Sequence, residues 1–265
     1  MSGNPPLAGH ALDKPSLFSP HGLIEAVRQH RGAGRGALPR VGILDFDGDL
    51  TDKLVSRGEV RQCLDWPCFH TRMWLWPASD PRCGIVDRSI GGPYTVLVAE
   101  QMAACGMETV VGLASAGRLA IDLPIPALVI AAEAVRDEGT SYHYLPASET
   151  VTADAGLVRA LERTTAELPL PKRTGLIWTT DAPYRETRAQ VDHWATRGAL
   201  AVEMQAASLF AFAQRMSVRA ALVAHVTNSV GIEDPSFDKG PEDGDVAILE
   251  AVVAAAEEGF GKSPR

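Results

Sequence analysis

The sequence predicts a single α/β domain with a mixed, mainly parallel β-sheet that helices cover on both faces. Three observations predict this fold class. Short, near-continuous apolar runs recur along the chain, segments of helical character lie between them, and no change in composition divides the 265 residues into two bodies. Hydrophobic residues make up 46% of the chain and charged residues 22%, which is typical of a globular domain with a sizeable core.

The elements follow in order from a boundary at residue 40. Residues 1–39 are rich in Pro, Gly and Arg, which predicts a flexible N-terminal lead-in, and residues 40–265 form the predicted domain. Apolar runs predict strands over residues 41–44, 83–86, 109–114, 127–132, 175–178 and 221–226. Amphipathic or Ala-rich segments predict helices over residues 94–105, 156–168, 187–197, 204–216 and 245–258.

The charge of the chain excludes one class of partner. A formal net charge of −8 is unsuited to a polyanion such as DNA or RNA, so no nucleic acid polymer is expected.

No apolar run is long enough to span a bilayer, and the N-terminal residues lack the pattern of a signal peptide, which predicts a cytoplasmic protein with no membrane partner. The four cysteines lack the paired spacing of a metal cluster, so no metal is expected. No cofactor is expected either, and no dinucleotide-binding G-x-G-x-x-G pattern follows the first strand.

The segment VEMQAASLFAFA, residues 202–213, is the most informative motif of the chain. It places Glu203 and Gln205 on either side of Met204 at the start of an otherwise apolar helix. Two polar side chains at the entrance of an apolar helix are typical of a ligand site. The alternative is a core helix in which the methionine fills a gap.

This segment resembles the V-E-M-E-x-A-x-L signature of the nucleoside phosphorylase family, the hexameric purine nucleoside and uridine phosphorylases with their nucleosidase relatives. The resemblance covers roughly residues 40–230 in motif order and implies a partly barrel-like sheet. It also implies that Met204 packs under a ribose and that Glu203 and Gln205 bind it. Gln205 replaces the family's carboxylate, but its amide still offers an acceptor and two donors to a diol.

Two segments resemble the phosphate loops of the family. LASAGRLA, residues 113–120, is expected to be a loop like R-x-G-[TS]-x-G, in which Ser115 and Gly117 match and Arg118 lies just beyond. The loop's arginine falls on Gly112, which cannot replace the bidentate contacts of a guanidinium. These residues are expected to bind phosphate or water.

The second such segment is DFDGDLTDK, residues 45–53, which resembles the turn G-D-P-x-R with Gly48 at its start. Its arginine position holds Asp52, so two phosphate-binding arginines are unmatched. The resemblance therefore leaves two acceptors open, inorganic phosphate as a co-substrate and water.

WTTDAPYRETR, residues 178–188, resembles the S-[ST]-D-x-F-Y segment that forms the base pocket in the family. Thr180, Asp181 and Tyr184 match it, and Glu186 and Arg188 lie where uridine-specific members read the uracil edge. All five are expected to bind the base. For Glu186 and Arg188 the alternative is an exposed, salt-bridged helix start.

The last strand leads into HVTNSVG, residues 225–231, where the family's Ser-Asp pair is replaced by Thr227 and Asn228. The family's aspartate protonates a purine, whereas an amide cannot act as a general acid but can hydrogen-bond a base carbonyl or N–H. Asn228 and His225 are therefore the expected catalytic residues, and a pyrimidine or 6-oxopurine base is favoured.

Together these motifs predict cleavage of the N-glycosidic bond of a nucleoside by phosphorolysis, which gives a free base and (deoxy)ribose 1-phosphate. Hydrolysis by a nucleosidase is the first alternative, because two arginines are unmatched. A noncatalytic nucleoside-binding protein of the same fold is the second. The resemblance also implies a homo-oligomer, either a dimer or a hexamer.

Overall fold

The computed structural model describes residues 7, 10–230 and 244–260. The described helices are α1 (Pro20–Arg31), α2 (Asp49–Ser56), α3 (Gly92–Ala104), α4 (Ala155–Thr164), α5 (Arg188–Thr196), α6 (Ala206–Met216) and α7 (Gly244–Glu257). The strands are β1 (Val41–Asp45), β2 (Arg61–Gln62), β3 (Trp74–Trp76), β4 (Cys83–Asp87), β5 (Thr109–Arg118), β6 (Ala127–Asp137), β7 (Thr150–Thr152), β8 (Lys172–Thr180), β9 (Ala201–Glu203) and β10 (Arg219–Ser229). The six predicted strands and five predicted helices are all confirmed.

The sheet is mixed and partly closed. Its strands run in the order β10-β6-β8-β9-β5-β1-β4-β3-β2, and β10 also pairs with β5, so that β5, β10, β6, β8 and β9 form a ring. The two longest pairings, β5 with β10 and β6 with β8, are parallel, whereas β10 and β6 are antiparallel. The predicted α/β fold with a barrel-like sheet is therefore confirmed.

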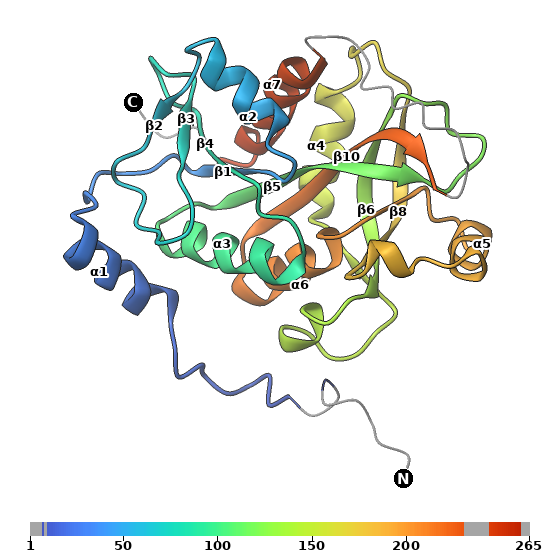
Figure 1. Ribbon diagram of the computed structural model, residues 1–265, viewed down its shortest axis with the longest axis horizontal. Coiled ribbons are helices and arrows are strands. Elements are labelled where there is room, and N and C mark those ends of the chain that lie inside the picture. The colour runs from blue at the N-terminus through green and yellow to red at the C-terminus, as the bar shows by residue number, and fades with distance from the viewer. Residues whose placement is uncertain (1–6, 8–9, 231–243, 261–265) are drawn as a thin grey trace.

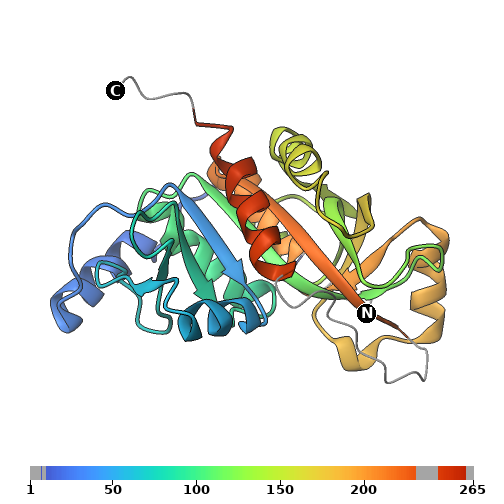
Figure 2. The same ribbon diagram turned by 90° about the horizontal axis from the view of Figure 1, so that it is seen from above.

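Helices cover the sheet on both faces. In Figure 1, α2, α4 and α7 lie above the sheet, and α3 and α6 lie below it. Apolar side chains alternate between these faces, as the two-residue period of a strand requires. On β1, for example, Val41 and Ile43 pack under α7 and Leu44 packs toward α3 and α6. Figure 2 shows the β1–β4 part with α1 at one end of the molecule and α5 at the other.

Helix α1 lies inside the segment that was expected to be a flexible lead-in. The Ser19 side chain accepts a hydrogen bond from the Gly22 N–H, and Pro20 takes the first helical turn, where its missing N–H costs nothing. Ile24 and Val27 are buried, and the helix packs on α3. Residues 20–31 are thus helical rather than irregular, and the domain boundary at residue 40 stays a prediction.

The segment 113–120 is not the loop that its small residues predicted. Strand β5 continues to Arg118, because β10 pairs with it on one side and β9 on the other. The glycine in this stretch serves packing: a Cβ on Gly117 would lie 2.3 Å from Cγ2 of Val230. Pairing on both edges thus outweighed the local preference of Gly and Ser for a loop.

Candidate functional site

Three parallel strands deliver polar side chains to one place. The apolar rows that face α7 are Val41 and Ile43 on β1, Val111 and Leu113 on β5, and Ala221 and Val223 on β10. Two residues further on, each row becomes polar, and the residues that follow are Asp45, Ser115 and His225. Ser115 lies directly beside His225 in the register, and Asp45 lies beside Leu113. The carboxyl ends of parallel strands are the usual position of a ligand site in an α/β sheet.

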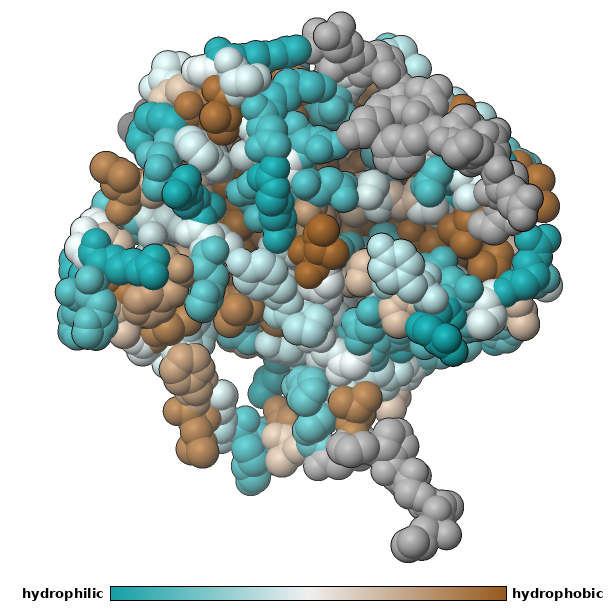
Figure 3. All heavy atoms as spheres, in the orientation of Figure 1, coloured by the Kyte–Doolittle hydropathy of each residue, from teal (hydrophilic) through white to brown (hydrophobic). Residues whose placement is uncertain are grey.

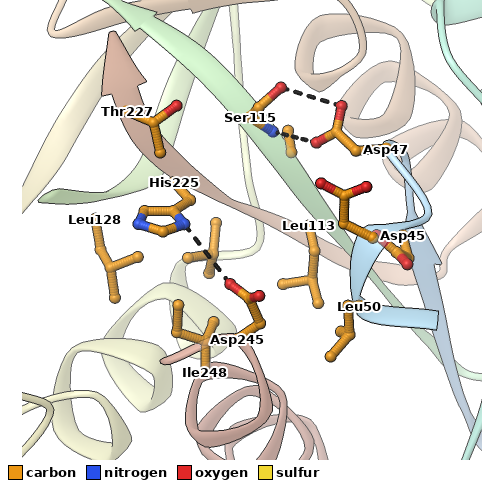
Figure 4. A pocket seen from close by; sticks show the side chains of 13 residues that line it. Asp45, Asp47, Leu50, Leu113, Ser115, Leu128, His225, Thr227, Asp245 and Ile248 are labelled. Atoms are coloured by element: carbon orange, nitrogen blue, oxygen red, sulfur yellow. Dashed lines mark hydrogen bonds and ion pairs between the residues drawn. The ribbon is translucent and has the colours of Figure 1, made fainter. Parts of the chain in front are cut away.

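These side chains line a cavity of about 340 Å³ (Figure 4). That volume suits a small molecule such as a nucleoside. Its walls combine apolar residues with four carboxylates, one histidine and two hydroxyls. The lining residues are Asp45, Asp47, Asp49, Leu50, Leu113, Ala114, Ser115, Leu128, Val223, His225, Thr227, Asp245 and Ile248.

Ser115 forms a small anion site at the edge of this cavity. Its backbone N–H donates to Oδ2 of Asp47 at 2.9 Å, and its Oγ donates to Oδ1 of the same carboxylate at 3.1 Å (Figure 4). Two donors that converge on the two oxygens of one anion are the kind of contact that phosphate oxygens also accept. A carboxylate of the protein itself therefore occupies the anion site.

Asp45 is buried at the end of β1, two residues before Asp47. Its carboxylate accepts hydrogen bonds from the N–H of Gly48 at 3.2 Å and from the N–H and hydroxyl of Thr51 at 2.8 and 2.7 Å. Burial nevertheless raises the pKa of Asp45 to about 6, because removal from water disfavours the charged form. Gly48 makes this turn possible, since it has a φ of 85° in the left-handed region.

On the opposite wall, His225 and Asp245 face each other from β10 and α7. Nδ1 of His225 lies 3.8 Å from Oδ1 of Asp245, and Nζ of Lys53 binds Oδ2 of Asp245 at 3.0 Å. Thr227 follows His225 on the same side of β10, is only 3% exposed, and its Oγ1 has no hydrogen-bond partner among the described residues. A buried hydroxyl of this kind is satisfied when a ligand supplies the partner.

The two positions at which the resemblance expects a phosphate-binding arginine hold Gly112 and Asp52, and each of these residues has contacts of another kind. Gly112 faces the core, where a Cβ would lie 2.7 Å from Cε2 of Phe46. Asp52 pairs with Arg88 at 2.5 Å, and Arg88 also binds Asp87. The guanidinium of Arg88, which lies beside Gly48, is thus held by two carboxylates.

Gly112 is expected to tolerate neither alanine nor arginine. A methyl group would overlap the ring of Phe46, which is 1% exposed and cannot move away without disturbing the core. We expect Gly112→Ala to lower the free energy of unfolding by about 2 kcal/mol through overpacking, as measured by urea denaturation. The matched control is Gly22→Ala in α1, where the nearest atom is 3.8 Å away. Equal stability of Gly112→Ala and wild type would contradict this packing.

The predicted ribose residues lie at the junction of β9 and α6. Glu203 is 5% exposed; its Oε1 accepts from the Thr179 hydroxyl at 2.6 Å, and its Oε2 accepts from the N–H groups of Gln205 and Ala206 at 2.6 and 2.9 Å. Gln205 is also buried and Met204 is half-buried. Glu203 therefore caps the start of α6, and none of the three lines the cavity. Their roles in ribose binding stay predictions.

Glu203 and Asp45 make stability depend on pH. Burial raises the pKa of Glu203 to about 7 from 4.5, and that of Asp45 to about 6 from 3.8. Between pH 4.5 and about 7 for Glu203, and between pH 3.8 and about 6 for Asp45, the acid therefore binds more protons in the folded state than in the unfolded state. Its contribution to the free energy of unfolding falls as the pH rises through that range.

We accordingly expect urea denaturation of the wild type to show a larger free energy of unfolding near pH ~5 than near pH ~8, by roughly 2 kcal/mol or more. Glu203→Gln removes the larger of the two titrations and should reduce the difference, whereas Glu162→Gln, an exposed position on α4, should leave it unchanged. A difference of the same size in Glu203→Gln would contradict the assignment.

The predicted base residues are spread along the chain that follows β8. Asp181 accepts a hydrogen bond from the Gly139 N–H at 2.8 Å, and burial raises its pKa. Tyr184 is 97% exposed, and Arg188 is an exposed residue paired with Asp192 at 3.2 Å. The remaining two, at the end of β8 and after the 3-10 turn η3 (Pro183–Arg185), are Thr180, which is buried, and Glu186, which is half-buried. None of the five lines the cavity, and their roles stay predictions.

Of the other predicted site residues, Ser115 and His225 line the cavity, whereas Gly48, Gly117, Arg118 and Asn228 do not. Gly48 belongs to the turn beside Asp45 and Asp47. Arg118 donates to the carbonyl of Leu123 at 2.9 Å. Asn228 is exposed and pairs with Gly117 in the register, just after a bulge that follows Val226.

Sequence reasoning did not single out Asp45, Asp47 or Asp245 as site residues, and it gave Thr227 no role of its own. A signal for the first two was present, since two acidic residues separated by one position follow an apolar strand. Asp245 had no such signal, because it lies twenty residues from His225 in the sequence.

Within the described residues, no group of three or more His, Cys, Asp or Glu side chains is arranged to hold a metal ion. No described helix is long and apolar enough to cross a membrane.

Comparison with known protein sequences shows which family this chain resembles. The family model of the phosphorylase superfamily matches residues 42–258. Guanosine phosphorylase of Halorubrum lacusprofundi is 33% identical over 150 residues, which cover 55% of this chain and 61% of the relative. Uridine phosphorylase of Thermococcus kodakarensis is 29% identical over 252 residues, 88% of each chain. Uridine phosphorylase of Escherichia coli is 23% identical over 233 residues, 80% of this chain and 90% of the relative.

Proposed function

The chain belongs to the phosphorylase superfamily, and on that premise we propose that it is an enzyme that cleaves the N-glycosidic bond of a nucleoside by phosphorolysis. The products are a free base and (deoxy)ribose 1-phosphate. The observation that carries the proposal is the anion site of Ser115 at the rim of a cavity of about 340 Å³. The relatives' names, guanosine and uridine phosphorylase, support the same reaction.

In this proposal phosphate takes the place of the Asp47 carboxylate on Ser115. The N–H and Oγ of Ser115 then hold two phosphate oxygens while a third oxygen faces the cavity, where the sugar lies. Attack on C1′ proceeds through a sugar with oxocarbenium character, whose positive charge the carboxylates of the lining stabilise. Inorganic phosphate is accordingly a co-substrate, and no other cofactor is proposed.

The base is proposed to be a pyrimidine or a 6-oxopurine. The amide of Asn228 can hydrogen-bond a base carbonyl or N–H, but it cannot protonate a purine nitrogen as a carboxylic acid can. The names of the relatives support this choice, since uracil is a pyrimidine and guanine a 6-oxopurine.

Hydrolysis is the second candidate, and two observations favour it. Asp47 already accepts both donors of Ser115, and neither unmatched arginine position supplies a cation to the site. A carboxylate at this place could accept a proton from water instead of making way for phosphate.

The test is incubation of the purified protein with guanosine, inosine, uridine and thymidine, with and without phosphate, followed by chromatography of bases and sugars. The proposal predicts base release that requires phosphate and yields sugar 1-phosphate. Release without phosphate would establish the hydrolytic candidate instead. Tight binding without release would favour a noncatalytic binding protein.

A homo-oligomer, either a dimer or a hexamer, and a cytoplasmic location are also part of the proposal. Large apolar side chains on the surface support self-association: Leu17, Phe18, Ile90 and Leu97 are 107%, 68%, 51% and 39% exposed. Figure 3 shows hydrophobic residues exposed among hydrophilic ones on the face seen in Figure 1. Sedimentation analysis of the purified protein tests this, and a monomer at micromolar concentration would contradict it.

A further inference from the structure

The anion site of the cavity is surrounded by carboxylates and lacks a cation to balance them. Asp47 is held by two neutral donors, the N–H and Oγ of Ser115. The hydrogen bonds of Asp45 also come from neutral donors, those of Gly48 and Thr51. Among the described residues that line the cavity, none is Lys or Arg. A phosphate ion that enters this place meets like charges, and this repulsion favours a ligand that brings a cation with it.

Asp45 and Asp47 offer oxygen atoms to such a cation from one wall of the cavity. Figure 4 shows both carboxylates on the β1 side. Burial raises the pKa of Asp45 to about 6, and the negative charge of Asp47 adds to this shift, so the two groups repel each other. A carboxylate has about four lone-pair sites. The hydrogen bonds given above take two of them on Asp47 and three on Asp45, so both side chains can still accept a cation.

A second, independent observation points to a ligand in the same cavity. Thr227 is 3% exposed and lines the cavity from β10, and its Oγ1 has no hydrogen-bond partner among the described residues. It projects from β10 on the same side as His225 (Figure 4). A phosphate oxygen, or a water molecule bound to a cation, supplies the partner that this buried hydroxyl lacks.

We propose that phosphate enters the cavity together with a hydrated divalent cation such as Mg²⁺, which bridges a phosphate oxygen and the carboxylate of Asp47. Asp45 contacts the same cation from the β1 wall, directly or through water. The inference rests on the proposed phosphorolysis and names the form of its co-substrate. The cation arrives with phosphate and departs with the sugar phosphate, so it is part of the co-substrate and not a resident cofactor.

The coordination chemistry of Mg²⁺ suits this arrangement. Mg²⁺ prefers oxygen ligands, keeps several of its water molecules, and binds through one or two carboxylates together with the phosphate of a substrate. Such a site needs fewer protein ligands than a resident metal centre. It therefore agrees with the finding that the described residues include no group of three or more metal-binding side chains.

The cation supplies the positive charge that Gly112 and Asp52 do not. In the described state both oxygens of Asp47 accept from Ser115. When phosphate takes these two donors, the carboxylate of Asp47 exchanges them for the cation and is not left unpaired. The charge of the cation also offsets the repulsion between Asp47 and phosphate, which otherwise opposes binding.

Steady-state kinetics at varied phosphate, in EDTA and in excess Mg²⁺, tests the proposal. We expect the KM of the wild type for phosphate to be at least about tenfold lower in Mg²⁺. In Asp47→Ser, Mg²⁺ should change this KM by less than about twofold, because the carboxylate that the cation neutralises is gone. Glu162→Ser, at an exposed position on α4 outside the cavity, should keep the wild-type response to Mg²⁺.

A binding measurement without any nucleoside tests the site directly. Mn²⁺ serves as the probe, and the electron paramagnetic resonance signal of free Mn²⁺ reports binding, with a protein-free blank to correct for association of Mn²⁺ with phosphate. We expect the dissociation constant of Mn²⁺ to be at least about fivefold lower with phosphate than without it. Asp47→Asn should lose this effect and Glu162→Gln should keep it. Circular dichroism checks the folding of each variant.

The outcomes separate the inference from the proposed function. Phosphorolysis with the same KM for phosphate in EDTA and in Mg²⁺ would overturn the inference and leave the proposed function standing. Mn²⁺ binding that does not respond to phosphate would also overturn the inference. Phosphate-dependent Mn²⁺ binding by a protein that cleaves no nucleoside in either medium would support the cation site and overturn the proposed function.

Discussion

Replacing Glu203 by alanine is expected to lower the free energy of unfolding by about 3 kcal/mol or more. The side chain is 5% exposed and accepts hydrogen bonds from the Thr179 hydroxyl and from the N–H groups of Gln205 and Ala206. Alanine leaves these three buried donors without their acceptor, and each buried donor left unsatisfied costs roughly 1–3 kcal/mol. It also removes a carboxylate from the N-terminus of α6, where the helix dipole favours negative charge.

Urea denaturation measures the effect, and two variants delimit it. In Glu203→Gln the amide oxygen can keep the two backbone contacts while the amide nitrogen donates to Oγ1 of Thr179, so the loss should be about 1 kcal/mol. Glu162→Ala, at an exposed position on α4, should change stability by less than about 0.5 kcal/mol. A Glu203→Ala protein as stable as the Glu162→Ala protein would show that the carboxylate does not hold the β9–α6 junction.

Replacing Asp47 by serine is expected to change the use of phosphate more than any other single substitution in the cavity. The carboxylate competes with phosphate for the N–H and Oγ of Ser115 and repels it as a like charge. Its removal should lower the KM for phosphate by about ten- to a hundredfold, since a charge-assisted contact contributes about 1.5–3 kcal/mol. Any release of base without phosphate should fall in the same variant.

Steady-state kinetics at varied phosphate, with a fixed saturating nucleoside, measures this change. Glu162→Ser is the matched control, because Glu162 is an exposed carboxylate on α4 that does not line the cavity. It should keep a wild-type preference between phosphate and water. An unchanged KM for phosphate in a folded Asp47→Ser protein would show that Asp47 does not occupy the phosphate position.

The strands of the site could be predicted from the sequence because their apolar rows are regular. Val41 and Ile43 alternate with a residue on the opposite face, and the same two-residue period carries His225 to the cavity side of β10. Ser115 was singled out by its motif, although the segment around it was expected to be a loop. Its hydroxyl reaches the cavity because β5 continues as a strand, and its role in binding phosphate stays a prediction.

The anion site itself could not be predicted, because it depends on a contact between two segments. Asp47 and Ser115 are 68 residues apart, and nothing local indicates that the carboxylate reaches both donors. Asp245 depends similarly on how α7 packs against the sheet. Helix α1 was missed because its apolar positions, Ile24 and Val27, are few and lie among residues typical of a lead-in.

One measurement tests the central claim, that nucleosides are cleaved in the cavity at the ends of β1, β5 and β10. Release of base and formation of sugar 1-phosphate are followed for the wild type and for Ser115→Phe, whose larger side chain fills the anion site from an exposed position. The prediction is phosphate-dependent cleavage by the wild type, with kcat/KM at least about a hundredfold lower in a folded Ser115→Phe protein. Undiminished cleavage by that variant, or no cleavage of any nucleoside by the wild type, would contradict it.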